Sequence, residues 1–176
     1  MTTLLGISGS LRKESTNTKL IRQAAEIFAP EAFIEADINL PLYNGDIENG
    51  PGIPDMVQKL ADQIAAADAV IISTPEYNKA PSGSLKNALD WVSRTKGSPW
   101  KNKPLAIMSA AAGRAGGERT QFALRLMMMP FRPLILQGPE VLVADARNAF
   151  DESGKLTSER AMKTLTELMD ELKARI

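Results

Sequence analysis

The sequence predicts an α/β fold of one domain, in which helices cover both faces of a parallel sheet. Apolar runs alternate with amphipathic segments along the whole chain, which is the pattern of strand–helix–strand units. Crossovers between parallel strands are right-handed, and they place helices on both faces of the sheet, in three layers. The chain has 176 residues and no repeat, low-complexity tract or linker, so we expect a single domain over residues 1–176.

Five short apolar runs are predicted as strands. The first run is almost wholly apolar, which indicates a strand buried on both faces. The last strand has two candidates, of which the second is the more convincing. The predicted strands are Thr3–Ser8, Phe33–Ile38, Ala69–Ser73, Pro104–Ser109, and either Leu134–Leu136 or Glu140–Ala144.

Five segments carry apolar residues at helical spacing and are predicted as helices. They are Thr18–Phe28, Pro54–Ala67 with Pro54 at its first position, Ser84–Arg94, Glu118–Met128 and Ser158–Arg175. Ser82 or Ser84 is expected to cap the third of these helices. The stretch Asn39–Gly52 contains Pro41 and Asn-Gly pairs, and we predict that it is a loop.

The composition excludes several classes of function. The chain has no cysteine and no histidine, so disulfides, thiol nucleophiles, Ser-His-Asp hydrolysis and histidine metal sites are absent, and no metal site is expected. Lys plus Arg equals Asp plus Glu at 21 each, which gives no electrostatic signature of nucleic-acid binding. No run approaches a membrane span, and the N-terminus lacks the pattern of a signal peptide, so a cytoplasmic protein is expected. An enzyme of this composition would take its chemistry from a bound cofactor.

Ligands of open α/β sheets bind outside the carboxyl ends of the strands, which directs attention to the loops after the first, third and fourth strands. The first loop, Gly9–Thr18, brings hydroxyl, amide and cationic side chains to the start of a helix. The free N–H groups of a helix start, together with Arg12, suit a terminal phosphate. The alternative is that Ser15, Thr16 or Asn17 only caps the helix while Arg12 stays in solvent.

The other two loops suit the flat part of a ligand. In Thr74–Asn78, Pro75 stiffens the turn and Tyr77 offers a flat face, although a simple turn would explain the same residues. The loop Ala110–Gly117 is made of small residues apart from Arg114, which lets backbone approach a ligand closely, or makes a flexible connector. Neither a P-loop motif nor G-x-G-x-x-G is present, which argues against a P-loop NTPase and a dinucleotide-type Rossmann site.

Together these loops resemble the NADPH-dependent FMN reductase family, which includes bacterial quinone, chromate and azo-dye reductases. The resemblance covers nearly the whole chain. It is carried by Gly9-Ser10-Leu11-Arg12-Lys13-x-Ser15-x-Asn17, Leu40-Pro41-Leu42-Tyr43, Thr74-Pro75-Glu76-Tyr77-Asn78, Leu85-Lys86-Asn87-Ala88-Leu89-Asp90-Trp91, Gly116-Gly117-x-Arg119-x-Gln121 and Leu124-Arg125.

The resemblance implies a flavodoxin-like fold with strand order 2-1-3-4-5, bound FMN, and NADPH or NADH as co-substrate. It implies ping-pong hydride transfer to a small-molecule electron acceptor and a homodimer or homotetramer. The implied FMN contacts are Ser10, Leu11, Arg12, Ser15, Thr16 and Asn17 around the phosphate, Pro75, Glu76, Tyr77 and Asn78 along the ring, and Ser109, Ala110, Gly113, Gly116 and Gly117 as a third wall.

Three alternatives to the reductase stay open from the sequence. A flavodoxin-type electron carrier would share the fold, although such carriers are usually strongly acidic. An enzyme that supplies free reduced FMN to a partner monooxygenase would treat FMN as a substrate. A flavin-free structural or regulatory protein would keep the fold without the cofactor.

Overall fold

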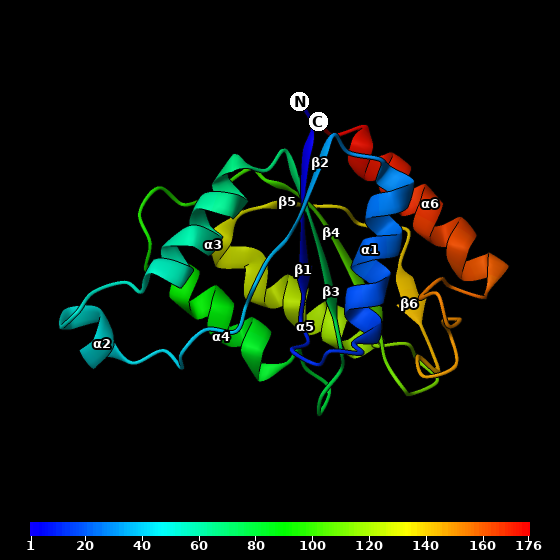
Figure 1. The fold of residues 1–176 in the computed structure, drawn as a ribbon, viewed down its shortest axis with the longest axis horizontal. Coiled ribbons are helices and arrows are strands. Elements are labelled where there is room, and N and C mark those ends of the chain that lie inside the picture. The colour runs from blue at the N-terminus through cyan, green and yellow to red at the C-terminus, as the bar shows by residue number, and fades with distance from the viewer.

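Six parallel strands form one sheet in the computed structural model, which describes all residues from 1 to 176 (Figure 1). The strand order is β2-β1-β3-β4-β5, and β6 also pairs with β4. The strands are β1 (Thr3–Ser8), β2 (Ala32–Glu35), β3 (Ala69–Thr74), β4 (Pro104–Ala110), β5 (Leu134–Ile135) and β6 (Val141–Val143). The helices are α1 (Thr16–Phe28), α2 (Gly45–Asn49), α3 (Asp55–Ala66), α4 (Gly83–Val92), α5 (Glu118–Met128) and α6 (Glu159–Lys173), with a 3₁₀ turn at Met129–Phe131.

The sheet is buried between two layers of helices, as predicted. Successive strand residues point to opposite faces, so Leu4 packs in the core under α1 and α6 while Leu5 packs in the core under α3, α4 and α5. The first of these cores contains 20 buried residues and the second 19, so the two faces of the sheet are covered by hydrophobic cores of nearly equal size. In Figure 1, α1 and α6 lie on one side of the strands and α3 and α4 on the other. This arrangement leaves only the ends of the strands open to a ligand.

Three of the predicted helices, α1, α4 and α6, begin close to their predicted starts, each after a serine whose side chain caps it. Ser15 accepts a hydrogen bond from the Thr18 amide at 3.2 Å, and α1 therefore starts two residues before the predicted Thr18. Ser82 caps α4 in the same way, by accepting from the Leu85 amide at 3.2 Å. None of the helices combines the length and the apolar composition that crossing a bilayer requires.

The edge of the sheet beyond β4 differs from the prediction of one fifth strand. Both candidate segments pair with β4: Leu134–Ile135 lies along Pro104 and Leu105, and Val141–Val143 lies along Met108 to Ala110. The sheet therefore has six strands, because the chain between β5 and β6 leaves the ladder and then returns to it. Apolar periodicity identifies each run as a strand, but it does not show that two runs share one partner.

Two side chains of α5 compensate for the interrupted edge. Arg125 donates to the Leu136 carbonyl at 2.9 Å, and Gln121 donates from Nε2 to the Val141 carbonyl at 2.9 Å. Burial lowers the pKa of the Arg125 guanidinium, and the carboxylate of Glu140 opposes that shift. These two side chains therefore tie the end of β5 and the start of β6 to α5.

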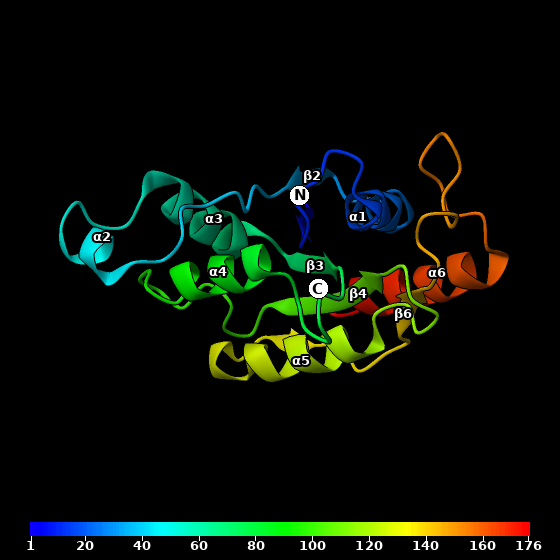
Figure 2. The same cartoon turned by 90° about the horizontal axis from the view of Figure 1, so that it is seen from below.

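The stretch Asn39–Gly52 was predicted as a loop, but it contains the short helix α2, and β2 ends at Glu35 instead of Ile38. α2 stands out at one end of the molecule in both Figure 1 and Figure 2. Asn44 caps it by accepting from the Asp46 amide at 2.9 Å. Arg94, from beyond the end of α4, donates to the α2 residue Glu48 at 3.0 Å. A contact from so far along the chain leaves no trace in the local turn composition.

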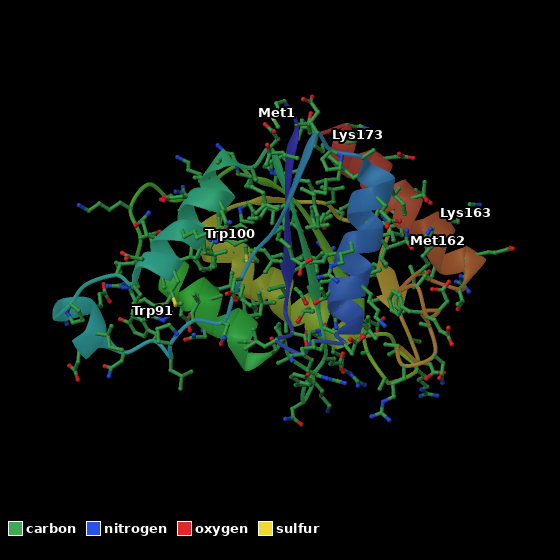
Figure 3. The ribbon with its side chains drawn as sticks, viewed as in Figure 1. Met1, Trp91, Trp100, Met162, Lys163 and Lys173 are labelled. Carbon is green, nitrogen blue, oxygen red and sulfur yellow. The ribbon has the colours of Figure 1, made fainter.

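The motif Leu40–Tyr43 is clamped to α4. Asn87 and Trp91 donate to the Pro41 carbonyl at 3.0 and 2.7 Å, and the Tyr43 amide donates to Asn87 at 2.9 Å. The rings of Tyr43 and Trp91 meet edge to face with centroids 5.0 Å apart. Trp91 lies between α4 and the segment that carries α2 (Figure 3). The motif Leu40–Tyr43 and the motif Leu85–Trp91, which are far apart in the sequence, are therefore in direct contact in the fold.

Replacing Gln121 with leucine tests the role of this side chain at the interrupted edge. Gln121 is fully buried, and Gln121→Leu removes its hydrogen bonds to the Val141 carbonyl and to the Ser109 hydroxyl. We expect a loss of about 1–3 kcal/mol in the free energy of unfolding, measured by urea denaturation. The exposed Gln137 is the matched control, and Gln137→Leu should cost far less. Equal losses in the two variants would contradict this role for Gln121.

Candidate functional site

The loop between β1 and α1 is held against β3 at the carboxyl edge of the sheet. The Gly9 amide donates to the Ser73 carbonyl at 2.7 Å, and the Ser82 hydroxyl donates to the Gly9 carbonyl. A Cβ atom at position 9 would lie 3.1 Å from the Thr74 Cα atom, so glycine permits this close approach. The first loop is therefore fixed beside the loop that follows β3, at the end of the sheet opposite the two termini (Figure 1).

The start of α1 offers free donors to this edge. The amides of Thr16 and Asn17 donate to no acceptor within the protein. Ser15 uses its hydroxyl oxygen to cap the helix, and its proton is free to donate outward. These groups carry the partial positive charge of a helix N-terminus, which attracts an anion.

The side chain of Asn17 is buried, 2% exposed, and its polar atoms are bound within the protein. Its Oδ1 atom accepts from the Ser73 hydroxyl at 2.7 Å and from the Ala110 amide at 3.0 Å. Its Nδ2 atom donates to the Ala110 carbonyl at 3.0 Å. Asn17 thus joins α1, β3 and β4, and it presents its backbone amide, not its side chain, to a ligand.

The loop after β3 is fastened to the start of α5. A carboxylate oxygen of Glu76 accepts from the Thr120 amide at 3.2 Å, and the Pro75 carbonyl accepts from the Thr120 hydroxyl at 3.2 Å. Asn78 and Lys79 have positive φ angles of 51° and 67°, and Tyr77 and Ala80 exchange backbone hydrogen bonds on either side of them. This is a two-residue hairpin turn, in which asparagine is favoured at the first position. It leaves Tyr77 about half exposed, at 51%.

The loop after β4 owes its small residues mainly to contacts within the protein. Ser109 is fully buried, donates to the Gly116 carbonyl at 2.7 Å and accepts from Gln121 at 2.9 Å. A Cβ atom at Gly116 would lie 2.6 Å from the backbone of Leu142, and one at Gly117 would lie 2.8 Å from Ser109. Both glycines also have positive φ, at 60° and 91°. These three residues shape the loop from inside.

A cavity of about 490 Å³ lies where the three loops meet. Nine of the predicted residues line it: Ser10, Arg12, Ser15, Thr16, Asn17, Pro75, Glu76, Tyr77 and Ala110. Six do not: Leu11, Asn78, Ser109, Gly113, Gly116 and Gly117. The volume falls in the range of small-molecule sites. A second cavity of about 480 Å³ runs along the later part of α4, away from the strand ends, and contains none of these residues.

The structure adds four lining residues that the sequence interpretation did not select: Glu14, Lys19, Ala146 and Arg147. Ala111 and Ala112, which lie within the stretch from Ser109 to Gly113 expected to form the third wall, also line the cavity. Ala146 and Arg147 follow β6, and the Ala146 amide donates to the Ala111 carbonyl at 3.1 Å. Because β6 runs parallel to β4, its carboxyl end reaches the same edge of the sheet. The rule that directed attention to the first, third and fourth strands would have found these two residues if it had been applied to the last strand.

The cavity carries charges of both signs. Arg12, Lys19 and Arg147 supply cations, while Glu14 and Glu76 supply carboxylates. Glu14 lies 3.7 Å from Lys19, and Glu76 accepts from α5. Arg12 and Arg147 form no ion pair within the protein, so both are available to a bound anion.

The inner role of Gly116 can be separated from ligand binding by comparison with Gly113 in the same loop. Gly116→Ala meets the backbone of Leu142 and forces alanine into a left-handed conformation, so we expect about 2–4 kcal/mol of destabilisation. A Cβ atom at Gly113 meets nothing within 4 Å, and Gly113→Ala should leave stability almost unchanged. Thermal unfolding of the protein without ligand measures both. A stable Gly116→Ala variant would contradict this packing role.

Comparison with known proteins identifies the family of this chain. The family model for NADPH-dependent FMN reductases matches residues 2–148. An NAD(P)H-dependent FMN reductase of Pseudomonas aeruginosa is 43% identical over 173 residues, covering 96% of this chain and 92% of the relative. A quinone reductase of Escherichia coli K12 is 36% identical over 163 residues, covering 90% of this chain and 86% of the relative.

Among solved structures, the flavoenzyme NAD(P)H:acceptor oxidoreductase FerB of Paracoccus denitrificans superposes with a TM-score of 0.87 at 32% identity. That match covers 99% of this chain and 96% of FerB. The chain is therefore an oxidoreductase that belongs to the NADPH-dependent FMN reductase family.

Proposed function

We propose that this reductase passes electrons from NAD(P)H to quinones and related small acceptors, using FMN held in the cavity at the carboxyl ends of the strands. One observation carries the proposal: a single cavity joins the free amides at the start of α1 to the flat, stiff Pro75–Tyr77 segment. The first part suits a phosphate and the second suits a ring. A mononucleotide with a flat head has both parts.

The phosphate end of FMN fits the first loop. The amides of Thr16 and Asn17 and the hydroxyls of Ser10 and Ser15 supply neutral donors, and Arg12 supplies a guanidinium that can bind two phosphate oxygens at once. Arg12 is exposed and forms no ion pair, so binding a phosphate would break no contact of that kind. The dipole of α1 adds to the attraction.

The ring end fits between the second and third loops. Pro75, Glu76 and Tyr77 line one side of the cavity, and Ala110, Ala111 and Ala112 line another. The three alanines present little more than backbone. The Ala112 amide donates to no acceptor within the protein and can reach a ring edge, whereas those of Ala110 and Ala111 are already bound. We assign Ser109, Gly116 and Gly117 the task of holding this loop in shape, because their contacts lie within the protein.

The chemistry that bound FMN would supply is to take a hydride from the nicotinamide and to pass the electrons on to the acceptor. The chain has neither histidine nor cysteine, so its residues bind, orient and shield the cofactor instead of supplying a nucleophile or an imidazole base. Glu76 keeps the ring-side loop tied to α5 through Thr120. No side chain is assigned as an acid or a base.

Quinones are proposed as acceptors because relatives over most of the chain are named quinone reductases. We also propose that the chain works in the cytoplasm as a homodimer or homotetramer. Phe122, Leu126 and Met129 are more than half exposed and recur at helical spacing along α5 and the turn that follows it. A row of exposed apolar side chains of this kind favours self-association.

Removing the Arg12 guanidinium tests the phosphate end of the site. We expect Arg12→Ala to weaken FMN binding by about 1.5–3 kcal/mol, the scale of a hydrogen bond to a charged group. Quenching of flavin fluorescence on titration of the protein into FMN measures this affinity. Arg160→Ala, on the exposed face of α6, is the control and should bind FMN normally. An unchanged affinity in Arg12→Ala would remove Arg12 from the site.

Steady-state oxidation of NADPH tests the activity and separates it from the alternatives. The purified, flavin-loaded protein should oxidise NADPH with a benzoquinone and no other protein present. An electron carrier would be inactive unless a separate reductase were added. An enzyme that supplies reduced FMN would lose its flavin on dialysis and turn over only with free FMN. A panel of quinones, chromate, azo dyes and free FMN then ranks the acceptors, and protein that stays colourless after FMN is added and removed would contradict the proposal.

A further inference from the structure

A third cavity, of about 400 Å³, lies on the other side of the first loop. It opens between that loop and the chain that leaves β2, from Glu35 to Asn39. Ser10 and Arg12 line both this cavity and the FMN cavity. The two spaces are therefore neighbours across the part of the chain that we assign to phosphate binding.

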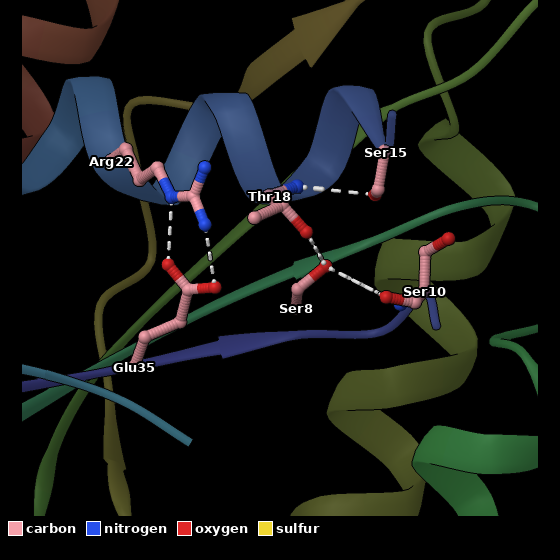
Figure 4. Close-up of polar contacts among 6 residues, drawn as sticks. All are labelled: Ser8, Ser10, Ser15, Thr18, Arg22 and Glu35. Atoms are coloured by element: carbon pink, nitrogen blue, oxygen red, sulfur yellow. Dashed lines mark hydrogen bonds and ion pairs between the residues drawn. The ribbon is translucent and has the colours of Figure 1, made fainter. Parts of the chain in front are cut away.

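The inner wall of this cavity is polar and ordered. Ser8 accepts from the Thr18 hydroxyl at 2.8 Å and lies 3.4 Å from the Ser10 carbonyl, to which it donates (Figure 4). It also accepts from the Ser10 amide at 3.3 Å, and both Ser8 and Thr18 are less than a tenth exposed. Arg22 donates to both oxygens of Glu35 at 2.8 and 2.9 Å, as the same figure shows. These contacts hold α1 against β1 and β2 and fix the shape of the wall.

Asp37 supplies an acceptor that the protein leaves partly free. Its Oδ1 atom accepts from the Asn39 amide at 2.8 Å, while its Oδ2 atom has no partner. Its side chain is exposed and follows directly from the carboxyl end of β2. Glu35, in contrast, has both oxygens occupied by Arg22. Asp37 is thus the carboxylate in this cavity that can receive the hydroxyls of a ligand.

A carboxylate beyond the second strand, one loop away from a phosphate site, is the arrangement by which dinucleotide-binding α/β folds hold the hydroxyls of an adenosine ribose. This chain lacks their G-x-G-x-x-G loop, and its first loop offers Ser10 and Arg12 to the phosphates instead. The other parts of a nucleotide also have counterparts here. Leu11, 54% exposed, offers apolar surface to a base. Arg12 and Lys13 offer positive charge to a second phosphate.

We propose that this cavity binds the adenosine 5′-phosphate half of flavin adenine dinucleotide, so that the chain accepts FAD as well as FMN. The flavin half then occupies the cavity assigned to FMN, on which this inference rests, and the diphosphate passes Ser10 and Arg12. Asp37 receives the two ribose hydroxyls. Because Ser10 and Arg12 line both cavities, one dinucleotide that occupies both would lie across these two residues.

The affinities of the flavin-free protein for FMN and FAD, measured by isothermal titration calorimetry, test the inference. The wild-type protein should bind FAD at least as tightly as FMN. Asp37→Ala should weaken FAD about tenfold relative to FMN, because the ribose loses hydrogen bonds to a charged group. Asp170→Ala on α6 is the matched control and should leave the ratio of the two affinities at the wild-type value. Asp37 is exposed, so circular dichroism should show an intact fold in both variants.

The outcomes separate this inference from the proposed function. Failure to bind either flavin would overturn both. Normal FMN binding with much weaker FAD binding, or an equal change of the ratio in the two variants, would overturn the adenosine subsite alone. A higher KM for NADPH in Asp37→Ala with unchanged FAD affinity would assign the cavity to the co-substrate and overturn it as well. AMP should bind the FMN-loaded protein far more weakly than FAD binds the flavin-free protein, and comparable binding would assign the cavity to a free nucleotide instead.

Discussion

The buried amide of Asn17 joins the three elements that meet at the cofactor cavity. Its three hydrogen bonds, to Ser73 and to both backbone groups of Ala110, bring the start of α1, the end of β3 and the end of β4 together. Removing that amide would take away the donor to the Ala110 carbonyl and the acceptor of the Ser73 hydroxyl, both of which are buried, at a cost of about 1–3 kcal/mol each. The position of the free amides of α1 depends on this contact, because it fixes where the helix begins relative to the sheet.

Around Asn17, the residues of the site divide into those that face the cavity and those that shape it. Ser10, Arg12 and Tyr77 face it. Ser109 and Gly116 bind each other and pack against β6, so their effect on a ligand passes through the position of Ala110 to Ala112. The division has a physical basis, since a rigid site needs buried polar groups that are fully paired among themselves before other groups can stay free for a ligand.

The outline of the fold could be predicted because it is written in local periodicity. Runs such as Ala69–Thr74 are short, apolar and rich in β-branched residues, which favours a buried strand, and the face of each helix follows from its 3.6-residue repeat. The split edge and α2 could not be predicted. They depend on Arg125 and Gln121 reaching across to β5 and β6, and on Arg94 reaching α2, and such contacts between distant residues leave no local pattern.

The sequence by itself determined the fold class, the loops that would hold a ligand, and the need for a cofactor in a chain without histidine or cysteine. Each of these follows from composition, periodicity or the polarity of a single segment. Only the tertiary structure decided which polar residue faces the cavity and which is consumed inside the protein. Ser15 and Asn17 lie two residues apart at the start of α1. The Ser15 side chain caps that helix, whereas the Asn17 side chain is bound by Ser73 of β3 and Ala110 of β4. Ser73 and Ala110 are 56 and 93 residues away from Asn17 along the chain, so only folding brings them to its side chain, and the linear sequence does not display these contacts.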